Sequence, residues 1–250
     1  DARFPRGSQV LATGWGLGES SWGGYSQRNR VPSNWLVPVP KSFDLSQAMA
    51  IGTAGFTAML CLAALEDYGL IPGQGPILVT GAGGGVGNMA IALLAAVGFS
   101  VTASTGRPYL EEYLRGLGAS DVISRDELDR KSKPLESEHW GAAVDSVGGQ
   151  TLATVLAQIR RGGAVTACGL AGGAELNTSV FPFILRGVSL LGVESVTTPQ
   201  ERRIKLWKRI EQLLPTSLAD RIGETIPLRE VPAAAERVLA GEVRGRLVVD

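Results

Sequence analysis

The segment from Ile77 to Gly87 has the residue types that bind a phosphate group through the backbone. It reads Ile-Leu-Val-Thr-Gly-Ala-Gly-Gly-Gly-Val-Gly, a short apolar run followed by a glycine-rich turn. Glycines remove the side chains that would keep a pyrophosphate away from the backbone, and the helix that follows offers free N–H groups at its positive end. The pattern therefore predicts a dinucleotide-binding turn between a strand and a helix.

The spacing of this turn is Ala82-x-Gly84-x-x-Gly87, in which alanine takes the place of the usual first glycine. Such a motif is weak alone, because glycine-rich turns also connect strands to helices where no ligand binds. Here the strand, the helix and the later strand–helix units all occur where the motif needs them. The cofactor contacts predicted in the turn are Ala82, Gly84, Gly85, Val86 and Gly87.

The end of the second strand distinguishes NAD from NADP. NAD sites place an acidic residue there, about 20 residues past the turn, to bind the ribose 2′-hydroxyl. This sequence instead has Ser104, Gly106 and Arg107, and no acid occurs before Glu111. A hydroxyl and a guanidinium bind a 2′-phosphate, which a carboxylate would repel. These three residues predict an NADPH site; the alternative is that Arg107 lies on a surface turn before Pro108.

Two later strands also end in loops of small residues, which suits a backbone that lies against a cofactor. One loop runs over 145–149 and the other over 168–173. In open α/β sheets, ligands bind outside the carboxyl ends of the strands, although either loop could be a plain turn. The contacts predicted here are Val147, Gly148, Cys168, Gly169 and Leu170.

Apolar strands that alternate with helices predict an α/β fold, a doubly wound parallel sheet of the Rossmann type covered on both faces. Residues 1–40 are rich in Gly, Trp and Ser, which indicates short strands and turns, and a helix interrupted near 52–55 follows. The predicted strands are 77–80, 99–103, 121–123, 142–145, 164–167, 188–193 and 246–249; the predicted helices include 86–97, 108–117, 199–214 and 230–240.

Composition excludes several classes of partner. The chain has 24 basic and 24 acidic side chains among its 250 residues, so no nucleic acid or membrane surface is expected as a bulk partner. The longest apolar stretch, Met89 to Val101, is too short to span a bilayer. Two cysteines in apolar runs suit buried, reduced thiols and a cytoplasmic protein.

The sequence offers little for metal or nucleophilic chemistry. Cys61, Cys168 and His139 do not have the spacing of metal ligands, so no metal site is predicted. Cys168 is expected to be a small core residue because no histidine partner is evident. The basic run over 202–209 predicts a solvated helix face, and the alternative is a handle for the phosphates of coenzyme A.

Several segments together resemble the zinc-independent medium-chain dehydrogenases/reductases, in the branch of acryloyl-CoA reductases that are often called quinone oxidoreductases. The resemblance covers essentially the whole chain. The segments that carry it are Gly52–Leu60, Gly81–Gly87, Ser104–Arg107, Ala167–Gly173 and Pro199–Arg203.

This resemblance implies a GroES-like catalytic domain around the Rossmann domain. Residues 1–45 would be part of the catalytic domain, 46–215 the NADPH-binding Rossmann domain, and 216–250 the return to the catalytic domain. The family has further N-terminal sequence with polar active-site residues. Because this chain starts at Asp1, within a sequence typical of the interior of a β domain, we expect it to be an excised or renumbered part of a longer protein.

The resemblance also implies the reaction, in which NADPH reduces a 2-enoyl thioester and negative charge develops on the thioester oxygen. Arg246 is expected to bind cofactor or to stabilise that charge, while Thr57 and Ser195 are expected near the cofactor. Reduction of a quinone, or a fragment that binds NADPH without catalysis, are the alternatives. Relatives are usually homodimers that pair through an edge strand, and Val188–Val193 is the expected edge.

Overall fold

The computed structural model describes residues 1–250, and contacts divide them into two compact units. We call residues 57–193 the sheet unit, and residues 1–56 with 194–250 the terminal unit. Helix α1 (Leu45–Asp67) has residues in both. The predicted boundaries at 45 and 215 refer to family domains, and that assignment stays a prediction.

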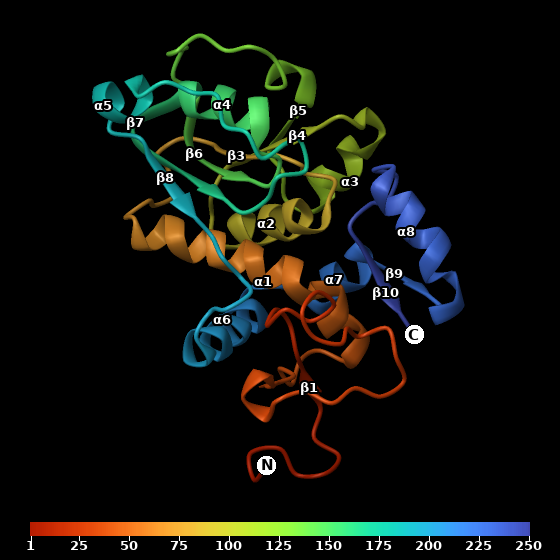
Figure 1. The fold of residues 1–250 in the computed structure, drawn as a ribbon. Helices are drawn as coiled ribbons and strands as arrows, with labels where there is room; N and C mark the ends of the chain where they lie inside the picture. The colour runs from red at the N-terminus through yellow and green to blue at the C-terminus, as the bar shows by residue number, and fades with distance from the viewer. The chain divides into compact units, whose positions relative to one another are not determined.

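The sheet unit is built on six parallel strands in the order β5-β4-β3-β6-β7-β8 (Figure 1). In chain order the first strand lies in the middle, and the direction of winding reverses between β3 and β6. This is the strand order of the Rossmann sheet, so the predicted fold class is confirmed. The strands are β3 (Ile77–Val79), β4 (Val101–Thr105), β5 (Asp121–Ser124), β6 (Trp140–Asp145), β7 (Ile159–Ala167) and β8 (Ser189–Gly192).

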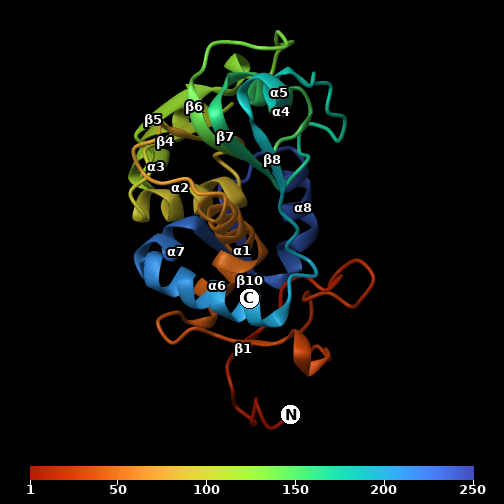
Figure 2. The same cartoon turned by 90° about the vertical axis from the view of Figure 1, so that its left-hand side faces the viewer.

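Helices cover both faces of this sheet, which is why its central strands are apolar throughout. Helices α2 and α4 lie on opposite faces (Figures 1 and 2). On the α4 face, Leu152, Val155 and Leu156 pack in one core cluster with Leu78 and Val165 of the strands. The helices of the unit, besides the end of α1, are α2 (Gly85–Ala96), η2 (Pro108–Leu110), α3 (Glu111–Gly116), η3 (Arg125–Glu127), α4 (Gly149–Gln158) and α5 (Phe181–Arg186).

Helix α1 is kinked at Gly52, where φ is 45° and ψ is −150°. Glycine adopts this conformation without the steric cost that a Cβ would add, so the predicted interruption of the helix is confirmed. At 23 residues and a mean hydropathy of 1.9, α1 is longer than the predicted longest apolar stretch and could cross a membrane by length and composition alone. However, 83% of its most apolar window is buried in the protein, as in the core helix of a globular domain.

The terminal unit contains two small sheets. One is the antiparallel pair β1 (Val10–Leu11) and β2 (Val37–Pro38); the other is the parallel pair β9 (Gly223–Ile226) and β10 (Arg246–Val249). The terminal strand was predicted, whereas α7 and β9 were not. The helices of this unit, besides the start of α1, are η1 (Ser33–Trp35), α6 (Gln200–Leu213), α7 (Thr216–Ile222), η4 (Leu228–Glu230) and α8 (Val231–Leu239).

Glu136 fixes the long connection between η3 and β6. Its carboxylate accepts hydrogen bonds from both terminal nitrogens of Arg130, at 2.8 and 2.6 Å, and from Gln158 Nε2 at 3.0 Å. The backbone N–H of Lys133 also donates to it at 3.0 Å. The Arg130 guanidinium is the main cause that lowers the pKa of Glu136 to about 2. The charged carboxylate is therefore the form that holds this connection in place.

We predict that Glu136 makes stability depend on pH in the acid range. Because folding lowers its pKa from 4.5 to about 2, its contribution is present above pH 4.5 and is lost as the pH falls toward 2. Glu136→Gln should cost on the order of 1–3 kcal/mol at pH 7 and should flatten the acid limb of stability. Urea unfolding at a series of pH values measures both effects.

The matched control is Glu175→Gln, which removes the same charge from an exposed side chain. It should unfold like the wild type at every pH. An unchanged acid limb in Glu136→Gln would mean that another carboxylate carries the pH dependence.

Candidate functional site

The glycine-rich turn joins β3 to α2 at the point where the direction of winding reverses. Gly81 has a φ of 58°, and the N–H of Gly84 donates to the Gly81 carbonyl at 2.9 Å. The N–H of Ala82 donates to the Ser104 carbonyl at 3.1 Å, which ties the turn to the end of β4. Helix α2 begins at Gly85, so its free N–H groups lie at the carboxyl edge of the sheet, where a pyrophosphate would bind.

Gly87 lets the first turn of α2 pack directly on the glycine-rich turn. A Cβ on Gly87 would lie 2.4 Å from the Gly81 carbonyl oxygen and 2.6 Å from Ala82 Cα, and both of these are backbone atoms. Asn88 adds a second tie, because its Nδ2 donates to the Ala82 carbonyl at 2.6 Å and its Oδ1 accepts from the Tyr113 hydroxyl. Asn88 was not predicted from the sequence, because it carries no motif of its own.

Arg107 lies against the glycine-rich turn, although it is more than 20 residues away in sequence. A Cβ on Gly83 would lie 2.4 Å from Arg107 Nη2 and 3.1 Å from its Cζ. The Arg107 N–H donates to Thr105 Oγ1 at 3.1 Å, and Ser104 is buried at the end of β4. The structure therefore brings a guanidinium and the pyrophosphate turn together, which favours the phosphate-binding interpretation of Arg107 over a plain surface turn.

Asp145 holds the loop after β6, a role that was not predicted from the sequence. Its carboxylate is fully buried and accepts from Thr80 Oγ1 at 2.7 Å and from the Gly148 N–H at 2.8 Å. Burial raises the pKa of Asp145, and these hydrogen bonds oppose that rise. Because Thr80 follows β3 directly, this carboxylate links the loops on both sides of the reversal point.

The two predicted loops of small residues also contact each other. Gly148, at a φ of 72°, forms an isolated bridge with Gly173. The N–H of Gly172 donates to the Val147 carbonyl at 2.7 Å. The backbone of both loops thus lies at the carboxyl edge of the sheet beside the glycine-rich turn, and Leu170 is 67% exposed there.

Cys168 is not the core residue that the sequence predicted. It lies half-buried where β7 ends, and its thiol donates to the Asp145 carbonyl at 3.3 Å. Cys61, on α1, is fully buried against it. A hydrogen bond between the two thiols lowers the pKa of Cys168 and, together with burial, raises the pKa of Cys61.

Thr57 is the first residue of the sheet unit and is buried on α1. The predicted contacts of the glycine-rich turn, of the end of β4 and of the two loops belong to the same unit and gather at the carboxyl ends of its strands. Ser195 and Arg246 belong to the terminal unit. Whether any of these residues contacts a cofactor stays a prediction.

Ser195 lies on a segment that a buried arginine holds. Arg203 donates from Nη2 to the carbonyls of Ser195 and Val196, at 3.0 and 3.2 Å, and from Nη1 to Thr13 Oγ1 at 3.0 Å. Its guanidinium also lies 4.6 Å from the centre of the Phe56 ring. The prediction that the whole basic run of α6 is solvated is therefore wrong at Arg203, which is fully buried because it lies on the packed face of the helix with Leu206 and Ile210.

Arg246 begins β10 close to the kink of α1. A Cβ on Gly52 would lie 3.4 Å from Arg246 Nη2. The side chain is largely withdrawn from water, which lowers the pKa of the guanidinium, and its Nε is buried without a hydrogen-bond partner. A desolvated guanidinium with an unused donor is suited to hold an anion.

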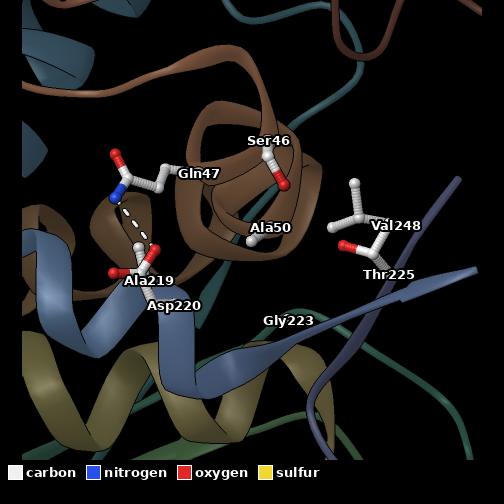
Figure 3. A pocket seen from close by; sticks show the side chains of 8 residues that line it. All are labelled: Ser46, Gln47, Ala50, Ala219, Asp220, Gly223, Thr225 and Val248. Atoms are coloured by element: carbon white, nitrogen blue, oxygen red, sulfur yellow. Dashed lines mark hydrogen bonds between the residues drawn. The ribbon is translucent and has the colours of Figure 1, made fainter. Parts of the chain in front are cut away.

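A cavity of about 140 Å³ lies elsewhere in the terminal unit, between the start of α1, α7 and the β9–β10 pair (Figure 3). Gln47 Nε2 donates to Asp220 Oδ1 at 2.9 Å beside it, and the Gln47 N–H donates to Asp44 Oδ1 at 2.7 Å. These hydrogen bonds cap α1 and tie it to α7, so the role of Gln47 and Asp220 is to stabilise the fold. None of the predicted cofactor contacts lines this cavity.

The His, Cys, Asp and Glu side chains form no group of three or more that could hold a metal ion. The sheet unit thus gathers backbone N–H groups, Ser104 and the Arg107 guanidinium around the reversal point, which is chemistry suited to a phosphorylated dinucleotide. The terminal unit separately contains the desolvated guanidinium of Arg246.

Comparison with known proteins identifies the family. Residues 85–212 match the family model of zinc-binding dehydrogenases. The chain is 51% identical over its full length to the acrylyl-CoA reductase AcuI of Ruegeria pomeroyi and 52% identical to the probable acrylyl-CoA reductase AcuI of Escherichia coli, and it covers 76% of each. The chain therefore belongs to the medium-chain dehydrogenases/reductases, in the branch of the acrylyl-CoA reductases.

Solved structures agree with this placement. The crystal structure of Escherichia coli K-12 YhdH with bound NADPH matches the whole chain at a TM-score of 0.97 and 52% identity, and the chain covers 77% of it. Bacillus subtilis YhfP with NAD bound matches the whole chain at a TM-score of 0.95 and 45% identity, again with 77% covered. The predicted family resemblance is confirmed.

We predict that Gly87→Ala disrupts the dinucleotide turn. The added Cβ would meet two backbone atoms within 2.6 Å, so α2 must shift and its N–H groups leave their positions. Overpacking of this kind costs about 1–3 kcal/mol of stability, and NADPH binding should weaken at least tenfold. Thermal unfolding with and without NADPH measures both effects.

Gly24→Ala is the control, since its Cβ would meet no atom within 4 Å and its φ is ordinary. It should leave stability and NADPH binding as they are. Normal NADPH affinity in Gly87→Ala would show that the first turn of α2 does not hold the pyrophosphate.

Proposed function

We propose that this protein is a zinc-independent reductase that uses NADPH to reduce an activated C=C bond, with a 2-enoyl thioester such as acryloyl-CoA as substrate. The observation that carries the proposal is Arg107, packed on Gly83 of the glycine-rich turn at the end of a strand that offers no carboxylate. The identity of 51–52% to acrylyl-CoA reductases over the full chain supports the choice of substrate.

The glycine-rich turn and the free N–H groups of α2 bind the pyrophosphate, while Ser104 and Arg107 bind the 2′-phosphate. The loops around Val147–Gly148 and Cys168–Leu170 lie along the cofactor, and Thr57 and Ser195 contact it. When bound, NADPH supplies a hydride from nicotinamide C4 to the β-carbon of the substrate. The α-carbon then takes up a proton.

The reaction needs a desolvated cation near the thioester oxygen, and the environment of Arg246 makes it such a cation. Negative charge develops on the thioester oxygen as hydride arrives, and a fixed donor that is already desolvated stabilises it without reorganisation. The buried Nε of Arg246 has no partner within the chain, and its guanidinium is largely withdrawn from water. Arg246 therefore binds that oxygen or a phosphate of the cofactor.

A second function has a specific observation in its favour. The putative quinone oxidoreductase YhfP of Bacillus subtilis is 46% identical over the whole chain, so quinone reduction at the same cofactor site is the alternative. A chain that binds NADPH without turnover is a further alternative. Two free thiols, Cys61 and Cys168, fit a reducing compartment, and we place the protein in the cytoplasm.

The test follows NADPH oxidation at 340 nm with acryloyl-CoA and, separately, with a simple quinone. We expect faster turnover of the thioester. Arg246→Ala should lower kcat/KM by about 10²–10³-fold, the usual cost of one lost oxyanion donor, and Arg246→Lys should restore part of it. Faster quinone turnover would favour the second function, whereas NADPH binding without turnover of either acceptor would defeat both.

We also propose that the protein forms a homodimer through the edge strand β8, because that strand pairs only with β7 and leaves one edge open. Apolar side chains are exposed beside this edge: Ile184 of α5 is 68% exposed, Leu185 49% and Leu190 of β8 36%. Pairing of two such edges would bury these side chains and satisfy the open backbone groups.

We predict that Ile184→Asp combined with Leu190→Lys yields monomers, because the pairing would then bury charge. Sedimentation velocity at micromolar concentration measures the change. Ile71→Asp combined with Tyr109→Lys is the control, as it adds the same two charges to exposed side chains of the sheet unit that lie outside α5 and β8. A wild-type protein that sediments as a monomer would rule the dimer out.

A further inference from the structure

The two cysteines of the chain lie in contact in the sheet unit. Cys168 follows β7 directly and is half-buried, whereas Cys61 lies on α1 and is fully buried. The Cys61 thiol donates a hydrogen bond to the Cys168 sulfur. The Cys168 thiol in turn donates to the Asp145 carbonyl at 3.3 Å. The two sulfur atoms are therefore neighbours, and only one of them is within reach of a small molecule in solution.

The Cys168 thiol is the more reactive of the two. The hydrogen bond from Cys61 lowers the pKa of Cys168, and burial and the Asp145 carboxylate oppose that effect only in part. The same hydrogen bond, together with burial, raises the pKa of Cys61 well above its ordinary value. The thiolate is the form of cysteine that reacts with oxidants, and it reacts where it is accessible. A small oxidant therefore reacts at Cys168 first.

We propose that Cys168 is a modification site for peroxides and that Cys61 resolves the modified residue to a Cys61–Cys168 disulfide. The Cys168 thiolate attacks one oxygen of hydrogen peroxide and the O–O bond breaks, which leaves a sulfenic acid and water. The Cys61 sulfur then attacks the Cys168 sulfur, the S–O bond breaks, and the proton of Cys61 leaves with the hydroxyl as a second water. Peroxide takes up the two electrons that the two thiols lose.

The disulfide displaces the loop after β7. A covalent bond brings the two sulfur atoms closer together than a hydrogen bond does. Cys168 then has no proton to donate to the Asp145 carbonyl, so that hydrogen bond is lost. The next residue, Gly169, is packed so tightly that a Cβ on it would lie 2.5 Å from the Ser146 carbonyl oxygen. The displacement therefore reaches the loop after β6 as well.

Both of these loops belong to the proposed NADPH site, so we expect the disulfide to weaken NADPH binding. This consequence rests on the proposed function, whereas formation of the disulfide does not. Disulfides in proteins of reducing compartments are usually transient and serve catalysis or redox sensing. The disulfide would accordingly make cofactor binding respond reversibly to peroxide.

The test is intact-mass spectrometry of the protein after treatment with hydrogen peroxide. The disulfide lowers the mass by about 2 Da, whereas each added oxygen raises it by about 16 Da. We expect the loss of mass in the wild type and its reversal by dithiothreitol. In Cys61→Ala we expect no loss of mass, and instead labelling of Cys168 by dimedone, a reagent for sulfenic acids. In Cys168→Ala we expect neither the loss of mass nor the label.

The Kd for NADPH measures the consequence. Oxidation of the wild type should raise this Kd by about 3- to 10-fold, the cost of one lost hydrogen bond, and dithiothreitol should restore it. Cys61→Ala is the matched control, because the same treatment cannot join its sulfur to α1. Before treatment this variant should bind NADPH as the wild type does, and peroxide should change its Kd by less than about twofold.

The outcomes separate this inference from the proposed function. An unchanged mass in the wild type, or oxygen added at Cys168 without the loss of mass, would overturn the disulfide. A disulfide between two copies of the chain, which non-reducing electrophoresis detects, would overturn it as well. An intramolecular disulfide with an unchanged Kd for NADPH would overturn its effect on the cofactor loops. An untreated wild-type protein that does not bind NADPH would instead defeat the proposed function, and the mass would still decide the disulfide.

Discussion

The close approach of α2 to the Gly81 carbonyl is the constraint on which the cofactor edge depends. Only a residue without Cβ at position 87 allows it, because the helix backbone and the turn backbone are in contact there. This packing fixes where the free N–H groups of α2 lie. The hydrogen bond from the Ala82 N–H to the Ser104 carbonyl then holds the end of β4 beside the same turn. The positions of the side chains that we assign to the 2′-phosphate therefore depend on where the N-terminus of α2 lies.

On the other side of the reversal point, a buried carboxylate fixes the positions of the loops. Asp145 has no cation beside it, and its burial raises its pKa. It is tolerated because Thr80 and the Gly148 N–H both donate to it, so that its two oxygens are each satisfied. These hydrogen bonds offset the cost of burying the group, and they hold together the loops that follow β3 and β6.

The sequence predicted what depends on local pattern. The six strands, the kink at Gly52 and the glycine-rich turn follow from apolar runs and from glycine positions, and the alternation of strands with helices predicts the parallel sheet. The buried role of Arg203 could not be found this way. Arg203 lies within a basic run, and its burial depends on hydrogen bonds to the carbonyls of Ser195 and Val196 and to Thr13, which is 190 residues away in sequence.

The comparison with relatives shows that this fold does not itself choose the dinucleotide. YhdH with NADPH and YhfP with NAD both match the chain at TM-scores of 0.95 or more. NADPH and NADH differ by one phosphate, so the side chains, and not the backbone that these proteins share, must distinguish the two cofactors. In Rossmann sheets the side chain at the end of the second strand is the one placed to make that distinction. In this chain that end offers Ser104 and Arg107 and no carboxylate, and Arg107 can lie against the glycine-rich turn only because Gly83 has no Cβ.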